Sequence, residues 1–269
     1  MQIANKVFVV TGGGNGIGRE VVLGLLARGA RVAAVDLSQE RLDGTAKLAG
    51  AGNRLSTHVV NVTDAAAVDQ LPAAVIDAHG QVDGLLNVAG IIQRFVPFAE
   101  LEVDDIERVL QVNFWGVVAT VRAFLPHLLR RPEAALVNVS SMGAFIPVPG
   151  QSVYGASKAA VKLLTEGLHA ELRDTPVRVT VVFPGAVATS ITDNSGVKAP
   201  AVAGANDNAA NTKVLPPAQA ADIIIRGMQK GANRVLVGRD AQVMDWFTRL
   251  VPERAMTMIA DRMAGLLQR

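Results

Sequence analysis

Short runs of apolar residues alternate along the chain with stretches in which apolar residues recur every three to four positions. The runs are rich in Val, Leu and Ala, which is typical of strands buried on both faces of a parallel sheet. The stretches between them have the period of helices that cover such a sheet. The pattern therefore predicts an α/β fold with a doubly wound, seven-stranded parallel sheet and helices on both faces. The predicted strands are residues 7–10, 31–35, 58–60, 84–86, 135–139, 177–183 and 234–237.

One of the helical stretches has a recognisable N-cap. Ser38 precedes a helix through Leu42 and Leu48, and serine is a common N-cap because its hydroxyl accepts a hydrogen bond from an otherwise unpaired backbone N–H. Long helical patterns also cover residues 104–129 and 153–173. Ligands of a doubly wound sheet bind at the carboxyl ends of its strands, so residues just after the predicted strands are the first candidates for a site.

Two segments depart from the alternation. Residues 189–217 are rich in Gly, Ala, Asn and Asp and too long for a simple connection, so we predict a substrate loop that can act as a lid. Residues 240–269 follow the last strand, and apolar residues recur at helical spacing from Val243 to Val251. We therefore predict one domain over residues 1–239 with a C-terminal helical extension. The apolar stripe of the extension can pack on the domain or a neighbouring subunit, or lie on a membrane surface, which we consider the less favoured alternative.

Composition excludes several classes of function. Half of the residues are hydrophobic and 19% are charged, as in a globular protein. The formal net charge is +2 and the basic residues are dispersed, so we expect no nucleic-acid partner. The absence of cysteine excludes disulfides and thiol nucleophiles, and we predict no metal site. Because the chain starts without a leader pattern and has no run of 18 apolar residues, we expect a cytoplasmic protein that does not span a membrane.

A glycine-rich turn joins the first predicted strand to the first helix. Gly12, Gly16 and Gly18 allow the backbone to approach a pyrophosphate, which the amino end of the helix then attracts. The spacing is a variant of the dinucleotide-binding pattern G-x-G-x-x-G, whose last position is Arg19 here. A purely structural turn is the alternative interpretation.

Asp36 ends the second predicted strand, 18 residues beyond Gly18. A carboxylate at this place can accept hydrogen bonds from an adenosine ribose, although an aspartate that merely opens a helix is the alternative. Such a carboxylate would repel the 2′-phosphate of NADP, and neither Asn15 nor Leu37 brings a compensating positive charge. The sequence therefore favours NAD, with NADP less favoured.

Tyr154 is the only tyrosine in the chain, and Lys158 follows it by four residues. In a helix this spacing places both side chains on one face. A phenol with a pKa of about 10 needs roughly 4 kcal/mol to ionise near pH 7. A positive charge about 4 Å away supplies that amount at an effective dielectric of about 20. A packed tyrosine beside a solvated lysine is the alternative, and the pair alone favours it.

Further motifs follow at successive strand ends. With those already described, the set is Thr11-(x)3-Asn15-Gly16-Ile17-Gly18, Asn87-Val88-Ala89-Gly90, Asn113, Ser141, Tyr154-(x)3-Lys158 and Pro184-Gly185-x-Val187-x-Thr189. Taken together, these motifs resemble the short-chain dehydrogenase/reductase family, and the resemblance runs from about residue 5 to residue 237. It implies a single Rossmann-type domain, a nicotinamide cofactor, hydride transfer between a carbonyl and a hydroxyl carbon, and a homotetramer or homodimer.

The resemblance also implies roles for four residues. Tyr154 would be the general acid/base, and Lys158 would lower its pKa and hold the nicotinamide ribose. Ser141, which lies 13 residues before Tyr154, would hydrogen-bond the substrate oxygen and is chosen over Ser140 on that spacing. Asn113 would position a water in a proton relay; without the resemblance it reads as an ordinary helix residue.

Cofactor contacts are expected along the same strand ends. The chain departs from the family at Asn61-Val62, where aspartate is usual, and at Val88, where a second asparagine is usual. Asparagine can still donate and accept, so we expect the contact at Asn61 to survive. Besides Tyr154 and Lys158, the predicted cofactor residues are Gly12, Asn15, Gly16, Ile17, Gly18, Asp36, Leu37, Asn61, Val62, Asn87, Ala89, Gly90, Pro184, Gly185, Val187 and Thr189.

The predicted substrate residues are Ile92, Arg94, Ser141, Phe145 and Gln151. With several apolar neighbours, this set favours a hydrophobic secondary alcohol or ketone, of a steroid-like, alicyclic or lipid kind. Two other functions stay open at this point. One is an NAD-sensing protein without catalysis, which would have no need of a proton relay. The other is a membrane-associated lipid or retinoid dehydrogenase that uses the extension as its anchor.

Overall fold

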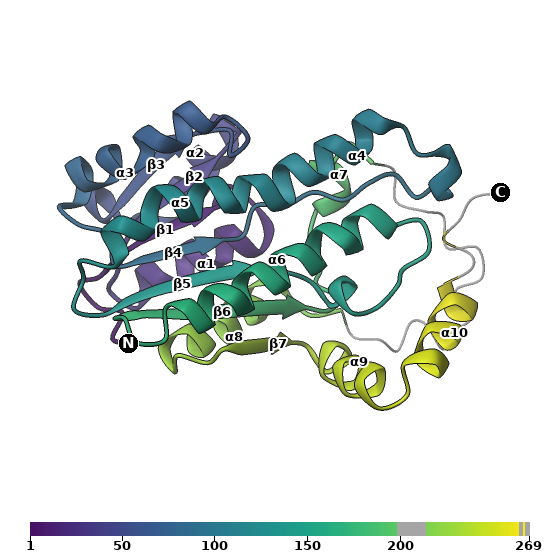
Figure 1. Cartoon of the computed structure of the whole chain (residues 1–269). Helices are drawn as coiled ribbons and strands as arrows, with labels where there is room; N and C mark the ends of the chain where they lie inside the picture. The colour runs from purple at the N-terminus through teal and green to yellow at the C-terminus, as the bar shows by residue number, and fades with distance from the viewer. Residues whose placement is uncertain (198–213, 264–265, 267–269) are drawn as a thin grey trace.

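The computed structural model describes residues 1–197, 214–263 and 266. Its centre is one parallel sheet of seven strands in the order β3-β2-β1-β4-β5-β6-β7, with helices on both faces (Figure 1). The predicted fold class is confirmed. Residues 198–213 of the predicted substrate loop lie outside the described residues. The strands are β1 (Val7–Thr11), β2 (Arg31–Asp36), β3 (Leu55–Val59), β4 (Gly84–Asn87), β5 (Ala134–Val139), β6 (Val177–Pro184) and β7 (Arg234–Val237).

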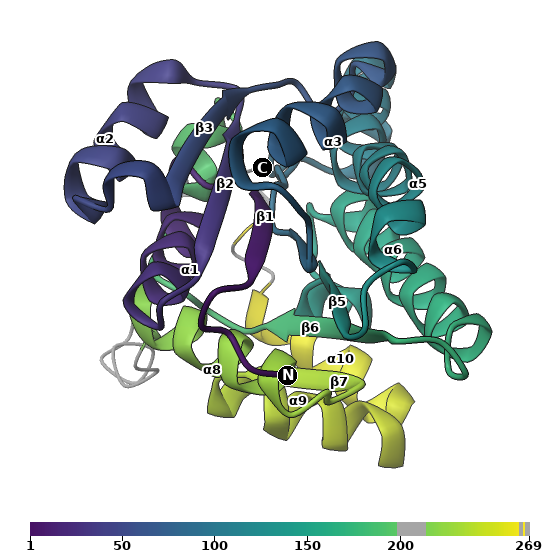
Figure 2. The same ribbon diagram turned by 90° about the vertical axis from the view of Figure 1, so that its left-hand side faces the viewer.

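Two hydrophobic cores lie on opposite faces of this sheet. Alternate residues of a strand point to opposite faces, so Phe8 and Val10 enter one core while Val7 and Val9 enter the other. Seen along the sheet, α1 and α8 cover the first face, and α3, α5 and α6 cover the second (Figure 2). The helices are α1 (Gly16–Ala27), α2 (Gln39–Ala49), α3 (Ala65–His79), α4 (Val103–Leu110), α5 (Gly116–Leu128), α6 (Ser152–Glu171), α7 (Ile191–Asn194), α8 (Pro217–Gln229), α9 (Arg239–Leu250) and α10 (Pro252–Met263).

Strand order reverses between β1 and β4. The chain runs outward from β1 to β2 and β3 and then returns to the other side of β1. The segments that follow β1 and β4 therefore lead away in opposite directions from the carboxyl ends of these two strands. Doubly wound sheets bind ligands at the crevice between such segments. In Figure 1, α4, α7 and α10 lie beyond the carboxyl ends of the strands.

Two predicted elements have different limits in the structure. The strand predicted at residues 58–60 is β3, which begins three residues earlier at Leu55. As an edge strand β3 is only partly buried, so its apolar signal is weak. The helix predicted over residues 104–129 is interrupted by a π-helical segment, η3 (Gln111–Trp115), between α4 and α5. The Ser38 N-cap is confirmed, because its Oγ accepts from the Arg41 backbone N at 3.3 Å.

The helical stretch Val103–Leu128 is long and apolar enough on average to cross a membrane, although the sequence has no unbroken apolar run of 18 residues. In the structure, Val117, Val121 and Phe124 of this stretch are buried in the core on the sheet. This burial is typical of a core helix of a folded domain, which passes the same length and composition criteria.

Helices α9 and α10 form the C-terminal extension. Ala241 and Ile259 are buried, whereas Val243, Trp246 and Leu250 of α9 are exposed. The predicted stripe is therefore divided, with Phe247 half-buried and Val243 on the surface. Packing against a neighbouring subunit or a membrane stays a prediction for these exposed residues.

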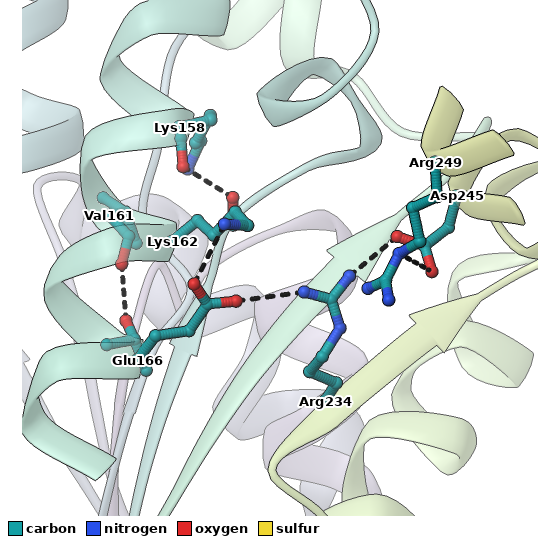
Figure 3. A network of polar contacts seen from close by, with 9 residues as sticks. Lys158, Val161, Lys162, Glu166, Arg234, Asp245 and Arg249 are labelled. Atoms are coloured by element: carbon teal, nitrogen blue, oxygen red, sulfur yellow. Dashed lines mark hydrogen bonds and ion pairs between the residues drawn. The ribbon is translucent and has the colours of Figure 1, made fainter. Parts of the chain in front are cut away.

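Arg234 of β7 links the extension to α6. Its guanidinium donates to Glu166 Oε1 of α6 at 3.0 Å and to Asp245 Oδ1 of α9 at 2.7 Å. The same guanidinium lies 4.6 Å from the centre of the Phe183 ring. Lys162 and Arg249 complete the network at its two ends (Figure 3). One side chain of β7 thus joins the start of the extension to Glu166 of α6, which lies 68 residues earlier in the chain.

We predict that Arg234→Met lowers the free energy of unfolding by about 2 kcal/mol, because it removes two partly shielded ion pairs and a cation–π contact. Arg249→Met is the matched control: it removes one ion pair to the same Asp245, but Arg249 is 59% exposed. Its cost should be about 0.5 kcal/mol. Urea unfolding of both variants measures the difference, and equal losses would contradict the role given to Arg234.

Candidate active site

A cavity of about 410 Å³ opens at the carboxyl edge of the sheet, around the ends of β1, β4 and β5. All of the predicted cofactor residues except Asn87 line it, together with Ser141 and Ile92. Among the described residues, no group of three His, Cys, Asp or Glu side chains is placed to hold a metal ion.

The glycine-rich turn forms one wall of the cavity. Gly12 has a φ of +70°, and a Cβ on Gly18 would collide with the Gly12 carbonyl oxygen. Asn15 caps α1, since its Oδ1 accepts from the Gly16 N at 2.7 Å. Arg19 donates to the Gly14 carbonyl oxygen on the outer side of the turn. The backbone at the amino end of α1 therefore borders the cavity at Gly16 and Gly18, which have no side chains. This arrangement fits the pyrophosphate of a dinucleotide.

Asp36 lies beside this turn at the end of β2. Its Oδ2 accepts from the Gly14 N at 3.0 Å, and its Oδ1 accepts from the Ser38 N at 3.1 Å. Each carboxylate oxygen keeps a further lone pair for a ribose hydroxyl. The carboxylate thus both fixes the turn and remains available to a ligand.

Arg41 was missed by the sequence reasoning, which considered only Asn15 and Leu37 as sources of positive charge. Arg41 lines the same cavity. A Cβ on Gly14 would lie 2.7 Å from the Arg41 Cβ and 2.8 Å from the Asp36 carboxylate, so the two side chains are neighbours. The Ser38 N-cap could have indicated this, because it starts the helix that brings Arg41 back toward the turn.

Asn87 lies beneath the cavity in a buried network. Its Nδ2 donates to Asn138 Oδ1 at 2.9 Å, and its Oδ1 accepts from Thr120 at 2.8 Å. Asn138 in turn donates to Thr165 of α6 at 3.0 Å. Its amide thus joins β4, β5, α5 and α6, because buried polar groups need partners. A contact of Asn87 with a cofactor stays a prediction.

Ser141, Tyr154 and Lys158 gather at the opposite end of the cavity from Asp36. The Ser141 hydroxyl faces Tyr154 and accepts from the Gly143 N at 3.0 Å. Lys158 is 3% exposed, and its Nζ donates to the Val139 carbonyl oxygen at 3.0 Å. Ser140 instead donates to the Lys158 carbonyl oxygen at 2.7 Å. The structure therefore brings Ser141, and not Ser140, to the phenol.

Burial sets the pKa values of this pair. Tyr154 keeps part of its surface open to the cavity, but its phenol is surrounded by protein, which raises its pKa above 10. The hydrogen bond with Ser141 lowers the Tyr154 pKa by a smaller amount. Burial also lowers the pKa of Lys158 from 10.5 to about 8. The expectation that Lys158 brings the phenol pKa down is thus not met in the protein alone, because desolvation dominates.

Asn113 lies in the π-helical segment and is fully buried. Its Nδ2 donates to the Ile91 carbonyl oxygen at 2.9 Å and to Ser157 Oγ at 3.0 Å. Its Oδ1 accepts from the Ile91 N at 2.9 Å. The side chain therefore fixes the segment after β4 against α6. Its place in a π-helix corrects the reading as an ordinary helix residue.

Three predicted substrate residues do not line the cavity. Arg94 donates to Asp105 at 2.7 Å on the surface. The Phe145 ring packs on Phe183, with 5.5 Å between ring centres. Gln151 is buried and donates to the Gln93 carbonyl oxygen at 2.8 Å. Each of the three side chains contacts a partner that lies outside the cavity lining.

Helix α7 supplies lining residues that the sequence reasoning did not single out. Ile191 and Asn194 line the cavity, and Asn194 Oδ1 accepts from Asn15 Nδ2 at 3.3 Å. Ser195 just after the helix accepts from the Ile92 N at 2.9 Å. The described start of the predicted substrate loop therefore touches both the glycine-rich turn and the segment after β4.

Comparison with known proteins identifies the family. Residues 6–199 match the short chain dehydrogenase family. The oxidoreductase SadH of Mycobacterium tuberculosis is 35% identical over 96% of this chain and 95% of its own length. The 1-deoxy-11-beta-hydroxypentalenate dehydrogenase of Streptomyces avermitilis is 34% identical over 90% of this chain and 88% of its own.

Two solved structures share the fold over nearly the whole chain. A short chain dehydrogenase/reductase from Burkholderia phymatum in complex with NAD has a TM-score of 0.83 and 26% identity, covering 96% of both chains. A short chain dehydrogenase from Burkholderia cenocepacia in complex with NADP has a TM-score of 0.80 and 28% identity, covering 96% of this chain and 99% of the other.

We predict that phenolate absorbance of the ligand-free protein appears only above pH 10, because burial raises the pKa of Tyr154. As Tyr154 is the only tyrosine, the signal has one source, and Tyr154→Phe should abolish it. Ser141→Ala should raise the midpoint further, because the hydrogen bond that lowers the pKa is lost. A wild-type midpoint at or below 10 would contradict this assignment.

Proposed function

The chain belongs to the short-chain dehydrogenase family, and from that membership we propose that it is an NAD-dependent oxidoreductase. It interconverts a secondary alcohol and a ketone on an apolar substrate, with Tyr154 as general acid/base. One observation carries the proposal. A single cavity joins the glycine-rich turn and Asp36 at one end to Ser141, Tyr154 and Lys158 at the other. The cavity thus pairs a dinucleotide-binding end with a proton-transfer end.

Each residue of the proton-transfer end has a distinct task in the proposed reaction. The Ser141 hydroxyl hydrogen-bonds the substrate oxygen and holds it against the phenol. Tyr154 Oη gives its proton to the oxygen in ketone reduction and takes it in alcohol oxidation. Lys158 keeps a positive charge at neutral pH, since its pKa of about 8 lies above 7. The nicotinamide, when bound, supplies or accepts the hydride.

The NAD preference rests on Asp36. A carboxylate next to the adenosine ribose disfavours a 2′-phosphate by repulsion. Arg41 works in the other direction, because it lines the same cavity beside Asp36. The related structures hold NAD in one case and NADP in another. We propose NAD because Asp36 is tied into the turn by two backbone N–H groups, whereas no side-chain hydrogen bond of Arg41 is found among the described residues.

The proposal of an apolar substrate is supported by apolar residues in the cavity wall. Ile91, Ile92 and Val112 line the same cavity as Ser141 and Tyr154. Arg94, a predicted substrate residue and a cation, is instead paired with Asp105. The dehydrogenase relative from Streptomyces carries a hydroxy compound in its name, which agrees with a hydroxyl or carbonyl substrate. We also propose that the protein forms a homotetramer or homodimer and that it is located in the cytoplasm.

The first test is turnover of a panel of secondary alcohols with NAD, monitored by NADH absorbance. We predict that Tyr154→Phe lowers kcat by about 10²- to 10⁴-fold, because the proton acceptor is lost. NAD binding, followed by fluorescence of the two tryptophans, should change little. Full activity of Tyr154→Phe would contradict the mechanism. Tight NAD binding without turnover of any alcohol would favour a sensor.

The second test exchanges the cofactor. We predict that Asp36→Asn raises KM for NAD about tenfold and lowers KM for NADP, because one charge-assisted contact is lost and a repulsion is relieved. Adding Arg41→Met should remove the gain with NADP. The ratio of kcat/KM values for the two cofactors measures both effects, and a wild-type preference for NADP would contradict the NAD assignment.

A further inference from the structure

Helix α6, which carries Tyr154 and Lys158, has no cap of its own. Gln151 occupies its N-cap position but makes no side-chain hydrogen bond to the helix, and the first turn contains no acidic residue. The first backbone N–H groups of a helix have no partner within the helix, so they need one from elsewhere when they are buried. The N–H of Tyr154 belongs to this group.

Gln93 supplies the missing acceptor from a segment 60 residues earlier in the chain. Its Oε1 accepts from the Val153 N at 2.8 Å and from the Tyr154 N at 3.0 Å. Its backbone carbonyl oxygen accepts from Gln151 Nε2 at 2.8 Å. Gln93 itself is 0% exposed. One buried residue therefore accepts three hydrogen bonds from the start of α6.

The segment that carries Gln93 is fixed independently of α6. Asn113 bonds both the N–H and the carbonyl of Ile91. The Ile92 N donates to Ser195 Oγ at 2.9 Å. Ile91 and Ile92 also line the cavity. Gln93 thus connects the backbone of Tyr154 to a wall of the same cavity in which its phenol lies.

We propose that Gln93 is a positioning residue, which sets the depth of the Tyr154 phenol in the cavity by holding the Tyr154 backbone. This rests on the proposed function of Tyr154 in proton transfer. Gln93 acts through Tyr154 and touches no reacting atom. Without the Oε1 acceptor, two buried N–H groups lose their partner, so the first turn of α6 must open to water or shift.

The Oε1 acceptor is the part of the Gln93 side chain that positions Tyr154. In the described ranges 1–197, 214–263 and 266, Gln93 Nε2 has no hydrogen-bond partner. Gln93→Glu keeps an acceptor oxygen for Val153 and Tyr154, and burial favours the neutral, protonated form of its carboxyl group. Gln93→Met has a similar length but offers no comparable acceptor, so it removes both bonds with little change of volume.

The experiment measures turnover and the phenolate titration in the same set of variants. For Gln93→Met we expect kcat to fall about 10- to 100-fold with KM for NAD unchanged, because the phenol is misplaced by a fraction of an ångström or more. Its Tyr154 pKa should fall toward 10, since water reaches the phenol. Gln93→Glu should restore most of kcat.

Gln81→Met is the matched control. Gln81 also makes two side-chain hydrogen bonds, to Asp83 and from Arg131, but it lies before β4 at the opposite edge of the sheet. Its loss should change neither kcat nor the titration. If Gln93→Met does not fold, Gln93→Asn serves instead, because the shorter amide cannot reach both N–H groups.

The proposal is overturned if folded Gln93→Met, or Gln93→Asn in its place, keeps the wild-type kcat and the wild-type titration midpoint. It is also overturned if Gln93→Glu is as inactive as Gln93→Met. The titration needs no substrate. A wild-type protein without turnover would therefore count against the proposed function, while the titration would still decide whether Gln93 sets the burial of Tyr154.

Discussion

Burial raises the pKa of Tyr154 and lowers that of Lys158, so it opposes charge on the two groups that the proposed chemistry needs in charged form. This desolvation cost accompanies the burial that holds the pair in fixed positions one helical turn apart. Ser141 on the phenol and the Val139 carbonyl oxygen on the ammonium compensate part of it. The site is consequently prepared as a protonated phenol beside a lysine whose charge is lost near pH 8.

Helix α6 is held at its two ends by different contacts, and both bear on the position of this pair. Gln93 and Asn113 fix its first turns to the segment after β4. Glu166, two turns beyond Lys158, joins Arg234 and through it the C-terminal extension. Because protein interiors transmit small shifts, contacts far from the phenol contribute to its geometry.

Much of the fold was predictable because buried parallel strands read as apolar runs, and six of the seven strands lie close to their predicted limits. Most of the cavity was predictable for a related reason, since the motifs sit at strand ends that one sheet edge brings together. The exceptions depend on partners distant in sequence. Arg94 is held by Asp105, Asn87 is drawn into a buried amide network, and Gln93 caps a helix 60 residues away. Periodicity carries no signal for such pairings.

The most direct test of the account is the phenolate titration of Tyr154 with and without saturating NAD. The protein alone should titrate above pH 10, because burial dominates. The positive ring of the oxidised cofactor should then favour the phenolate and lower the midpoint below 10, toward the range in which tyrosine serves as a base. A midpoint that stays at or above 10 with NAD bound would contradict proton transfer by Tyr154.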